Sequence, residues 1–108
     1  MEHMKAIYLD EPGAVSVKNV PKPEPRAGEV LVRMKSMAIC GSDVAAYRGV
    51  NQLVSYPRII GHELAGVVAS LEAAGETKLV EGQRVVLEPY ISCGKCYPCS
   101  IGRNNSCI

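Results

Sequence analysis

The stretch that decides the fold is Glu29-Val30-Leu31-Val32-Arg33-Met34-Lys35. Its side chains alternate in character, with Val30, Val32 and Met34 on one face and Arg33 and Lys35 on the other. A period of two residues is typical of a β-strand that buries one face. We therefore predict a strand that starts from Glu29 and runs through residues 30–35.

Runs of the same kind precede this strand. Residues 5–9 and 15–20 are short β-like segments separated by a turn cluster at 10–13, so they predict a hairpin. Three prolines lie between residues 21 and 28. Because proline has no N–H to donate to a neighbouring strand, this segment is predicted to be an extended surface connection.

Two further strands and a helix are predicted after the central strand. Residues 61–71 and 82–88 are β-branched runs, whereas residues 42–48 resemble a short helix with Ser42 as its N-cap and Asp43 in its first turn. The predicted fold is therefore mainly β. We expect a small, mostly antiparallel barrel or sandwich with one short helix and a cysteine-rich appendage at its C-terminal end.

Length and composition exclude several classes of protein. A chain of 108 residues is long enough for one domain or less. Its 12 basic and 11 acidic side chains are mixed along the chain, so no basic run predicts a nucleic-acid partner. The apolar stretch 64–69 is broken by Gly66 and is far shorter than the roughly 20 residues that cross a bilayer. With no basic, apolar secretory signal at its start, the chain is expected to be a soluble cytoplasmic protein without a membrane partner.

Four of the five cysteines are crowded near the C-terminal end. Two residues separate Cys93 from Cys96 and Cys96 from Cys99, and Cys107 follows after seven more. This spacing allows four thiolates to surround one zinc ion in a closed structural site. An iron–sulfur cluster and free or disulfide-linked thiols are the alternatives, but iron–sulfur runs continue with a three-residue spacer and a proline. We predict a structural zinc lobe over residues 93–107 that has no catalytic role.

The remaining cysteine suggests a second site. Cys40 follows the central strand, and His62 with Glu63 begins another, so two strand ends supply donors that an open zinc site uses. Each residue alone is a weak signal, since a single cysteine is more often a small buried side chain and a single histidine a structural one. A metalloprotease helix is excluded, because the second histidine that it needs would stand at position 66, which is Gly66.

Four motifs follow one another along the chain: Cys40-Gly41-Ser42-Asp43, Gly61-His62-Glu63 with Gly66-Val67-Val68, Gly82-Gln83-Arg84-Val85, and the array of Cys93, Cys96, Cys99 and Cys107. In this order they resemble the motifs of the zinc-dependent medium-chain alcohol dehydrogenases. The resemblance covers nearly the whole chain and implies a GroES-like, partly open β-barrel with a catalytic zinc and a lobe around a structural zinc. Residues 55–58 and 102–107 are most similar to the branch that oxidises polyols, sugar acids and threonine.

The resemblance also implies a role for each site residue. Cys40 and His62 match zinc ligands, and Glu63 matches a residue that binds the zinc in some members and lies behind the ligands in others. Ser42 matches the hydroxyl that relays the proton of the alcohol, although it could equally cap a helix. Asp43 matches the acid that orients the liganding histidine, although it could be a solvated acid in the first turn.

One part of such an enzyme lies outside the sequence. The family binds NAD or NADP in a Rossmann domain, and this chain ends one residue after Cys107, before that domain and the strands that complete the barrel. We therefore interpret residues 1–108 as an incomplete N-terminal GroES-like catalytic domain, inactive alone, from a homo-oligomeric enzyme that acts on a small alcohol. The alternative is a non-catalytic GroES-like zinc-binding structural module.

Overall fold

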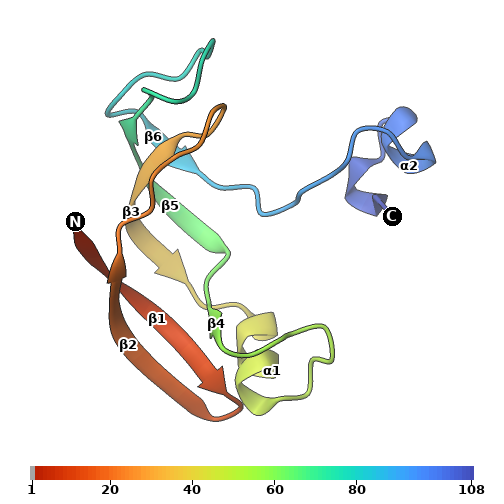
Figure 1. Cartoon of the computed structure of the whole chain (residues 1–108). Coiled ribbons are helices and arrows are strands. Elements are labelled where there is room, and N and C mark those ends of the chain that lie inside the picture. Colours follow the sequence, from red (N-terminus) through yellow and green to blue (C-terminus); the bar gives the residue numbers. More distant parts are fainter. Residues whose placement is uncertain (1) are drawn as a thin grey trace.

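Two small antiparallel sheets form the framework of the computed structural model, which describes residues 2–108 (Figure 1). Strand order is β2-β1-β4 in one sheet and β3-β5-β6 in the other. The strands are β1 (His3–Glu11), β2 (Ala14–Pro21), β3 (Leu31–Ala38), β4 (Arg58–Ile59), β5 (Glu63–Ser70) and β6 (Arg84–Val86), and the helices are α1 (Gly41–Arg48), α2 (Tyr97–Ser100) and the 3-10 turn η1 (Asn104–Ser106). The fold is mainly β, as predicted, and every strand pair among the described residues is antiparallel.

The first sheet contains the predicted hairpin. β1 pairs with β2 so that Ile7 lies opposite Val17 and Leu9 opposite Val15, and Gly13 takes the positive φ of 82° that the turn requires. Leu9 is fully buried, and three further apolar side chains among the described residues are buried with 7% exposure or less: Ala6, Ala46 and Val68. Each sheet and α1 therefore contributes at least one buried apolar side chain.

Much apolar surface stays uncovered. The accessible surface is 8468 Å², whereas a folded monomer of 11.6 kDa has about 5,800 Å² by the usual scaling of area with mass. The radius of gyration is 16.1 Å, against about 13 Å for a compact domain of this length. The two sheets do not join into a closed barrel within residues 2–108, so the barrel is open.

The central strand differs from its prediction in its length and in two irregularities of its pairing with β5, one between Leu31 and Val32 and one between Met34 and Ser36. β3 begins at Leu31 and continues to Ala38, so it extends three residues beyond the alternating stretch. Met34 pairs with Gly66 and Ser36 pairs with Ala65, which leaves Lys35 as the extra residue of a β-bulge. The bulge changes the register, and as a result Ala38 lies opposite Glu63.

Gly66 permits this register. A Cβ at position 66 would overlap the carbonyl of Arg33 and lie 3.0 Å from Val32 Cγ1. Gly66→Ala is therefore expected to lower the free energy of unfolding by about 1–3 kcal/mol, because the two strands would have to separate. Gly41→Ala is the control, since a Cβ there meets nothing within 4 Å and φ is ordinary. Equal urea midpoints for the two variants would contradict the prediction.

Helix α1 begins one residue earlier than predicted. Its N-cap is Cys40, in an extended conformation, and Ser42 is the second helical residue, so the prediction that Ser42 caps the helix is wrong. The reason is Asp43, whose Oδ2 accepts the N–H of Cys40 at 2.9 Å and so fixes the cap at that residue. The helix ends at Gly49, which has a left-handed φ of 74°.

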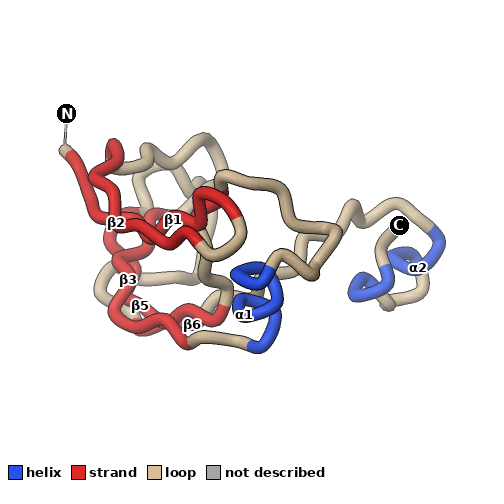
Figure 2. Tube along the Cα trace, turned by 90° about the horizontal axis from the view of Figure 1, so that it is seen from below, coloured by secondary structure: helices blue, strands red, loops and turns tan. Residues whose placement is uncertain are grey.

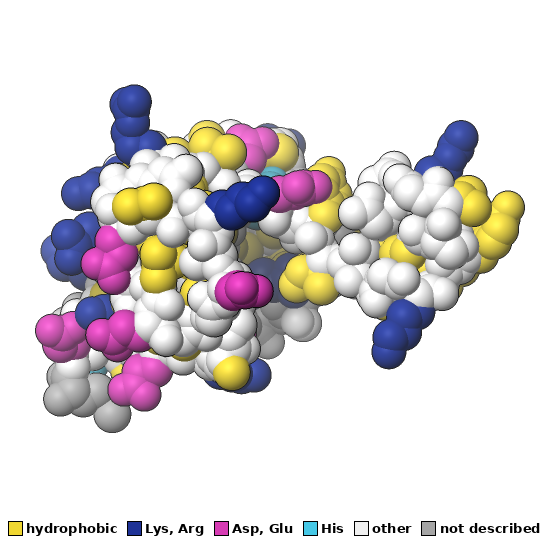
Figure 3. Space-filling model, turned by 90° about the horizontal axis from the view of Figure 1, so that it is seen from above, with side chains coloured by type: hydrophobic (Ala, Val, Ile, Leu, Met, Phe, Trp, Pro, Cys, Tyr) yellow, Lys and Arg dark blue, Asp and Glu magenta, His cyan; other side chains and the backbone are white. Residues whose placement is uncertain are grey.

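An extended arm joins the second sheet to the cysteine lobe. The strand predicted over 82–88 is shortened to β6, because Gly82 and Gln83 form a turn onto Val68 and a proline follows at 89. The lobe lies apart from both sheets in the tube view (Figure 2) and is joined through a narrow neck in the space-filling view (Figure 3). No helix among the described residues is both long enough and apolar enough to cross a bilayer.

Candidate metal centres

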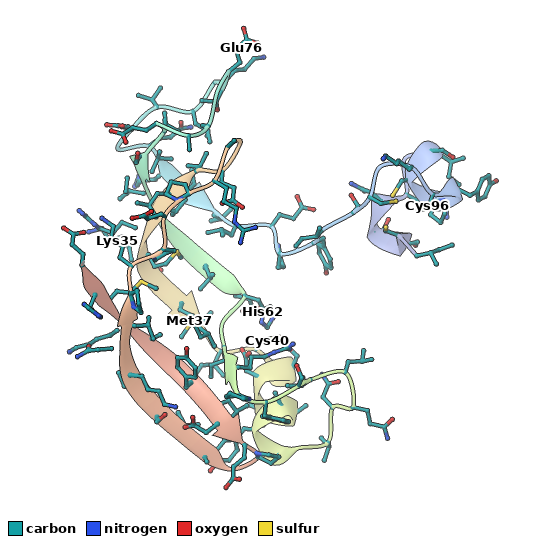
Figure 4. The ribbon with its side chains drawn as sticks, in the orientation of Figure 1. Lys35, Met37, Cys40, His62, Glu76 and Cys96 are labelled. Atoms are coloured by element: carbon teal, nitrogen blue, oxygen red, sulfur yellow. The ribbon has the colours of Figure 1, made fainter. Side chains whose placement is uncertain are left out.

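The first candidate centre lies where β3 ends and β5 begins. Cys40 follows β3 by two residues, Glu63 is the first residue of β5, and His62 precedes it. Because Ala38 pairs with Glu63, the two strand ends meet, and one ligand atom from each of Cys40, His62 and Glu63 lies within 4.8 Å of the others. Figure 4 shows Cys40 and His62 next to each other at this position.

Two helix residues complete the surroundings of His62. Asp43 Oδ1 lies 3.5 Å from His62 Nδ1, while its other oxygen holds the Cys40 N–H. A carboxylate on the Nδ1 side favours a proton there and leaves the Nε2 lone pair free for a metal. Ser42 Oγ lies 3.4 Å from His62 Nε2, on the side where that metal would bind. The structure therefore brings together all five residues that the sequence singled out for this site.

The electrostatics of the first centre favour a thiolate. Hydrogen bonds from the Ser42 hydroxyl and N–H, and then from His62, lower the pKa of Cys40 below its usual value. The pKa of His62 is raised, chiefly by its hydrogen bond to the Cys40 sulfur and also by the charges of Asp43 and Glu63. Three acidic groups therefore surround one imidazole. A thiolate, an imidazole nitrogen and a carboxylate suit zinc, which accepts all three donor types.

The first centre opens into a hollow of about 830 Å³. Four residues of the centre are among those that line it: Cys40, Ser42, His62 and Glu63. The sequence did not predict the remaining walls, because they come from segments that only strand pairing brings near the ligands. These additional wall residues include Ser36, Met37, Leu64, Val86, Leu87, Pro89 and Tyr90. A ligand site exposed to a partly apolar hollow has room for a small organic molecule.

The second candidate centre is the four-cysteine lobe. Sγ of Cys96 lies 3.4 Å from that of Cys99 and 3.9 Å from that of Cys107, and the Cys93 and Cys99 sulfurs are 4.0 Å apart. Four thiolates about 2.3 Å from one zinc ion would be about 3.8 Å from each other. The sulfurs are too far apart for disulfides, and all four cysteines are free. The spacing suits one ion rather than a multi-iron cluster, whose own atoms would keep the thiolates farther apart.

Backbone groups of the lobe also favour bound thiolates. The N–H groups of Lys95 and Cys96 donate to Cys93 Sγ at 3.3 and 3.2 Å. N–H groups of Ile108 and Cys99 lower the pKa of Cys96 to about 6, whereas the Cys96 sulfur and burial raise the pKa of Cys99 to about 11. Four neighbouring sulfurs cannot all ionise without a cation between them. The lobe therefore fits a single divalent ion that prefers sulfur.

Comparison with known protein families shows which family this chain is related to. The sequence model of the alcohol dehydrogenase GroES-like domain matches residues 26–107, which is most of the chain. The chain belongs to this family. The match includes both candidate centres, so Cys40, His62, Glu63 and the four cysteines of the lobe all lie within the alcohol dehydrogenase GroES-like domain.

Several curated relatives of this GroES-like chain are named as dehydrogenases. It is 52% identical over 106 residues to a zinc-type alcohol dehydrogenase-like protein of Haemophilus influenzae, covering 98% of this chain and 31% of the relative. It is 36% identical to both the L-galactonate-5-dehydrogenase of Escherichia coli and the sorbitol dehydrogenase of Bacillus subtilis, covering 99% and 98% of this chain and 31% of each relative. The chain therefore spans less than one third of the length of these proteins.

Solved structures of alcohol dehydrogenases share the GroES-like fold. One from Escherichia coli, complexed with NADH, superposes with a TM-score of 0.87 at 47% identity, covering 97% of this chain and 30% of that one. A thermostable alcohol dehydrogenase from Pyrobaculum aerophilum, with cobalt and zinc bound, superposes with a TM-score of 0.83 at 31% identity, covering 98% and 32%. The expectation of a GroES-like fold is confirmed.

Proposed function

We propose that residues 1–108 are the GroES-like catalytic portion of a zinc- and NAD(P)-dependent dehydrogenase that oxidises the secondary alcohol of a polyol, sugar acid or amino acid. The observation that carries this proposal is the first centre, where Cys40, His62 and Glu63 converge with Ser42 at the side of an open hollow. The names of the sorbitol and L-galactonate dehydrogenases support the substrate class. Residues 93–107 are the structural zinc lobe within this domain.

Each residue of the first centre has a definite role in this proposal. Cys40 and His62 bind the ion, and Glu63 either binds it directly or supports it from behind. A zinc ion at this position supplies Lewis acidity, which lowers the pKa of a substrate hydroxyl so that it loses its proton near neutral pH. Ser42 accepts that proton and passes it toward solvent. Asp43 keeps the His62 ring in the orientation and tautomer that ligation requires.

The hydride needs an acceptor that this chain does not provide. We assign that acceptor, NAD or NADP, to a part of the polypeptide outside residues 1–108, in keeping with relatives about three times as long. The hollow beside the first centre then holds the substrate, and Leu87 and Tyr90 contribute apolar side chains to its wall. We expect residues 1–108 alone to bind metal and to be inactive.

The proposal is tested with the full-length polypeptide that carries residues 1–108. Purified protein is expected to contain two zinc ions per chain and to reduce NAD or NADP in the presence of sorbitol, L-galactonate or L-threonine. Metal content is measured by elemental analysis, and reduction of the nicotinamide by its absorbance. One zinc per chain with no turnover of any polyol, sugar acid or amino-acid alcohol would contradict the proposal and favour the non-catalytic structural module.

The proton relay makes a separate prediction. Ser42→Ala is expected to lower kcat by about 10²–10³ at neutral pH, because the substrate proton loses its acceptor, while both zinc ions remain bound. The loss should shrink at alkaline pH, where hydroxide removes the proton directly. Ser70→Ala is the control, since that hydroxyl accepts only the N–H of Glu72 at 3.3 Å, away from the centre. An equal loss at every pH would contradict the relay.

A further inference from the structure

The hollow beside the first centre shares part of its wall with a second hollow. A hollow of about 710 Å³ lies between the two sheets, with Ile7 and Ile59 on one side and Val32 on the other. Ser36, Met37 and Leu64 line both this hollow and the one beside the first centre. In Figure 4, Met37 lies in the same part of the molecule as His62 and Cys40. Met37 therefore lies, with Ser36 and Leu64, in the wall common to the two hollows.

Met37 packs against the backbone that presents His62. Gly61, the residue before His62, has a φ of 115°, which side chains rarely tolerate. A Cβ on Gly61 would overlap Met37 Sδ and would lie 3.3 Å from Met37 Cγ and 3.6 Å from Leu64 Cδ2. The thioether thus occupies the space that any side chain at position 61 would need. Glycine at 61 and methionine at 37 are complementary in shape.

The Gly61-His62 turn lies between two anchored residues. Before it, the N–H of Ile60 donates to the carbonyl of Ile7 in β1 at 3.2 Å. After it, Glu63 pairs with Ala38, and Leu64 pairs with Met37. The Gly61-His62 segment therefore bridges the two sheets, and Met37 is the side chain nearest to the position that a Cβ of Gly61 would take. Any shift of this turn would move His62 relative to Cys40, which is held separately by Asp43.

We propose that Met37 is a positioning residue for the first centre: its thioether, packed on the Gly61 backbone, fixes the place at which His62 meets Cys40. This inference rests on the proposed function, since it takes Cys40 and His62 as metal ligands. Methionine suits the position because an unbranched, polarisable side chain fits irregular spaces beside a backbone. The alternative is that Met37 only fills space between the two hollows.

The test measures metal binding in the full-length protein. Met37→Ala is expected to weaken binding at the first centre by about 10-fold, as changes behind metal ligands do, and to alter the visible absorption of Co²⁺ bound there. Zinc affinity is measured by chelator competition. Met37→Leu, which keeps most of the volume, should recover most of the affinity and the wild-type spectrum. Met34→Ala is the control, because Met34 lies on the same strand and lines only the second hollow.

A second pair of variants tests the contact itself. Gly61→Ala should weaken metal binding strongly in the wild-type background and less strongly in Met37→Ala, because the overlap with Sδ is removed. Should Met37→Ala unfold, Met37→Val keeps strand propensity but lacks an atom at the Sδ position and should show the same loss. Wild-type affinity and spectrum in the folded Met37 variants, or additive effects in the double variant, would overturn the inference. Failure of the wild type to bind a second metal would instead overturn the proposed function, and the inference with it.

Discussion

Cys96→Ser is expected to release the ion from the lobe and to unfold residues 93–107, while the two sheets keep their structure. Cys96 Sγ lies close to both Cys99 and Cys107, so its loss breaks the tetrahedron. The lobe has little else to hold it together: neither α2 nor η1 buries a residue, and Tyr97 is 73% exposed. Zinc binding in such sites contributes about 10–16 kcal/mol, and one missing thiolate removes much of it.

Two measurements check this outcome. Elemental analysis should show one zinc fewer per chain, and trypsin should cleave rapidly after Lys95, between Cys93 and Cys96, and after Arg103, between Cys99 and Cys107. Ser100→Ala is the matched control, because that hydroxyl donates only to the carbonyl of Tyr97 at 2.7 Å and binds no metal. Unchanged zinc content and unchanged protection of the lobe in Cys96→Ser would refute the structural role of the ion.

Local sequence patterns predicted which strands form better than they predicted where those strands end or bulge. The alternation through Val32 and Met34 placed β3, and the turn cluster at 10–13 placed the β1–β2 hairpin, because both signals lie within a few residues. The bulge at Lys35 depends on a partner about 30 residues away, namely Gly66, and no local signal marked it. The two-residue strand β4 depends likewise on its pairing with Tyr8 and Leu9.

The two centres differed in how far the sequence could predict them. The cysteine lobe is local, so the spacing from Cys93 to Cys107 predicted a cluster that the geometry then brings within 4.8 Å. The first centre joins residues from two strand ends, so the sequence alone linked Cys40 to His62 only weakly, and the resemblance to a family strengthened that link. Met37, Leu87 and Tyr90 carried no signal at all, since apolar side chains enter a wall only through tertiary contacts.

The donor sets of the two centres imply opposite tasks. Four sulfurs around one position leave a tetrahedral ion no open coordination site, so the lobe can hold the arm but cannot activate a substrate. Cys40, His62 and Glu63 supply at most three ligands and face a hollow of about 830 Å³. An incomplete donor set beside open space is the arrangement that catalytic zinc requires. Removing one thiol from the lobe should therefore affect its folding, whereas removing the thiol of the first centre should affect catalysis.

Cys40→Ser is expected to abolish zinc binding at the first centre and to leave the lobe loaded. Serine is a favourable N-cap, so helix α1 should form as before, with the Cys40→Ser N–H still held by Asp43. A neutral hydroxyl is a poor zinc ligand beside the imidazole of His62. Losing a Lewis acid that supplies several kcal/mol should lower kcat/KM by about three orders of magnitude in the full-length protein.

The variant Cys96→Ser, which affects the lobe, serves as the reciprocal control for this prediction. Cys40→Ser should keep one zinc and a protease-resistant lobe, whereas Cys96→Ser should keep the zinc at the first centre and lose the lobe. Circular dichroism and thermal unfolding of Cys40→Ser should match the wild type with its first-centre metal removed, because the only difference is one side-chain atom at the N-cap of α1. Retention of two zinc ions with near-normal turnover would show that Cys40 is no ligand, and the open centre would then have to be sought elsewhere in the hollow.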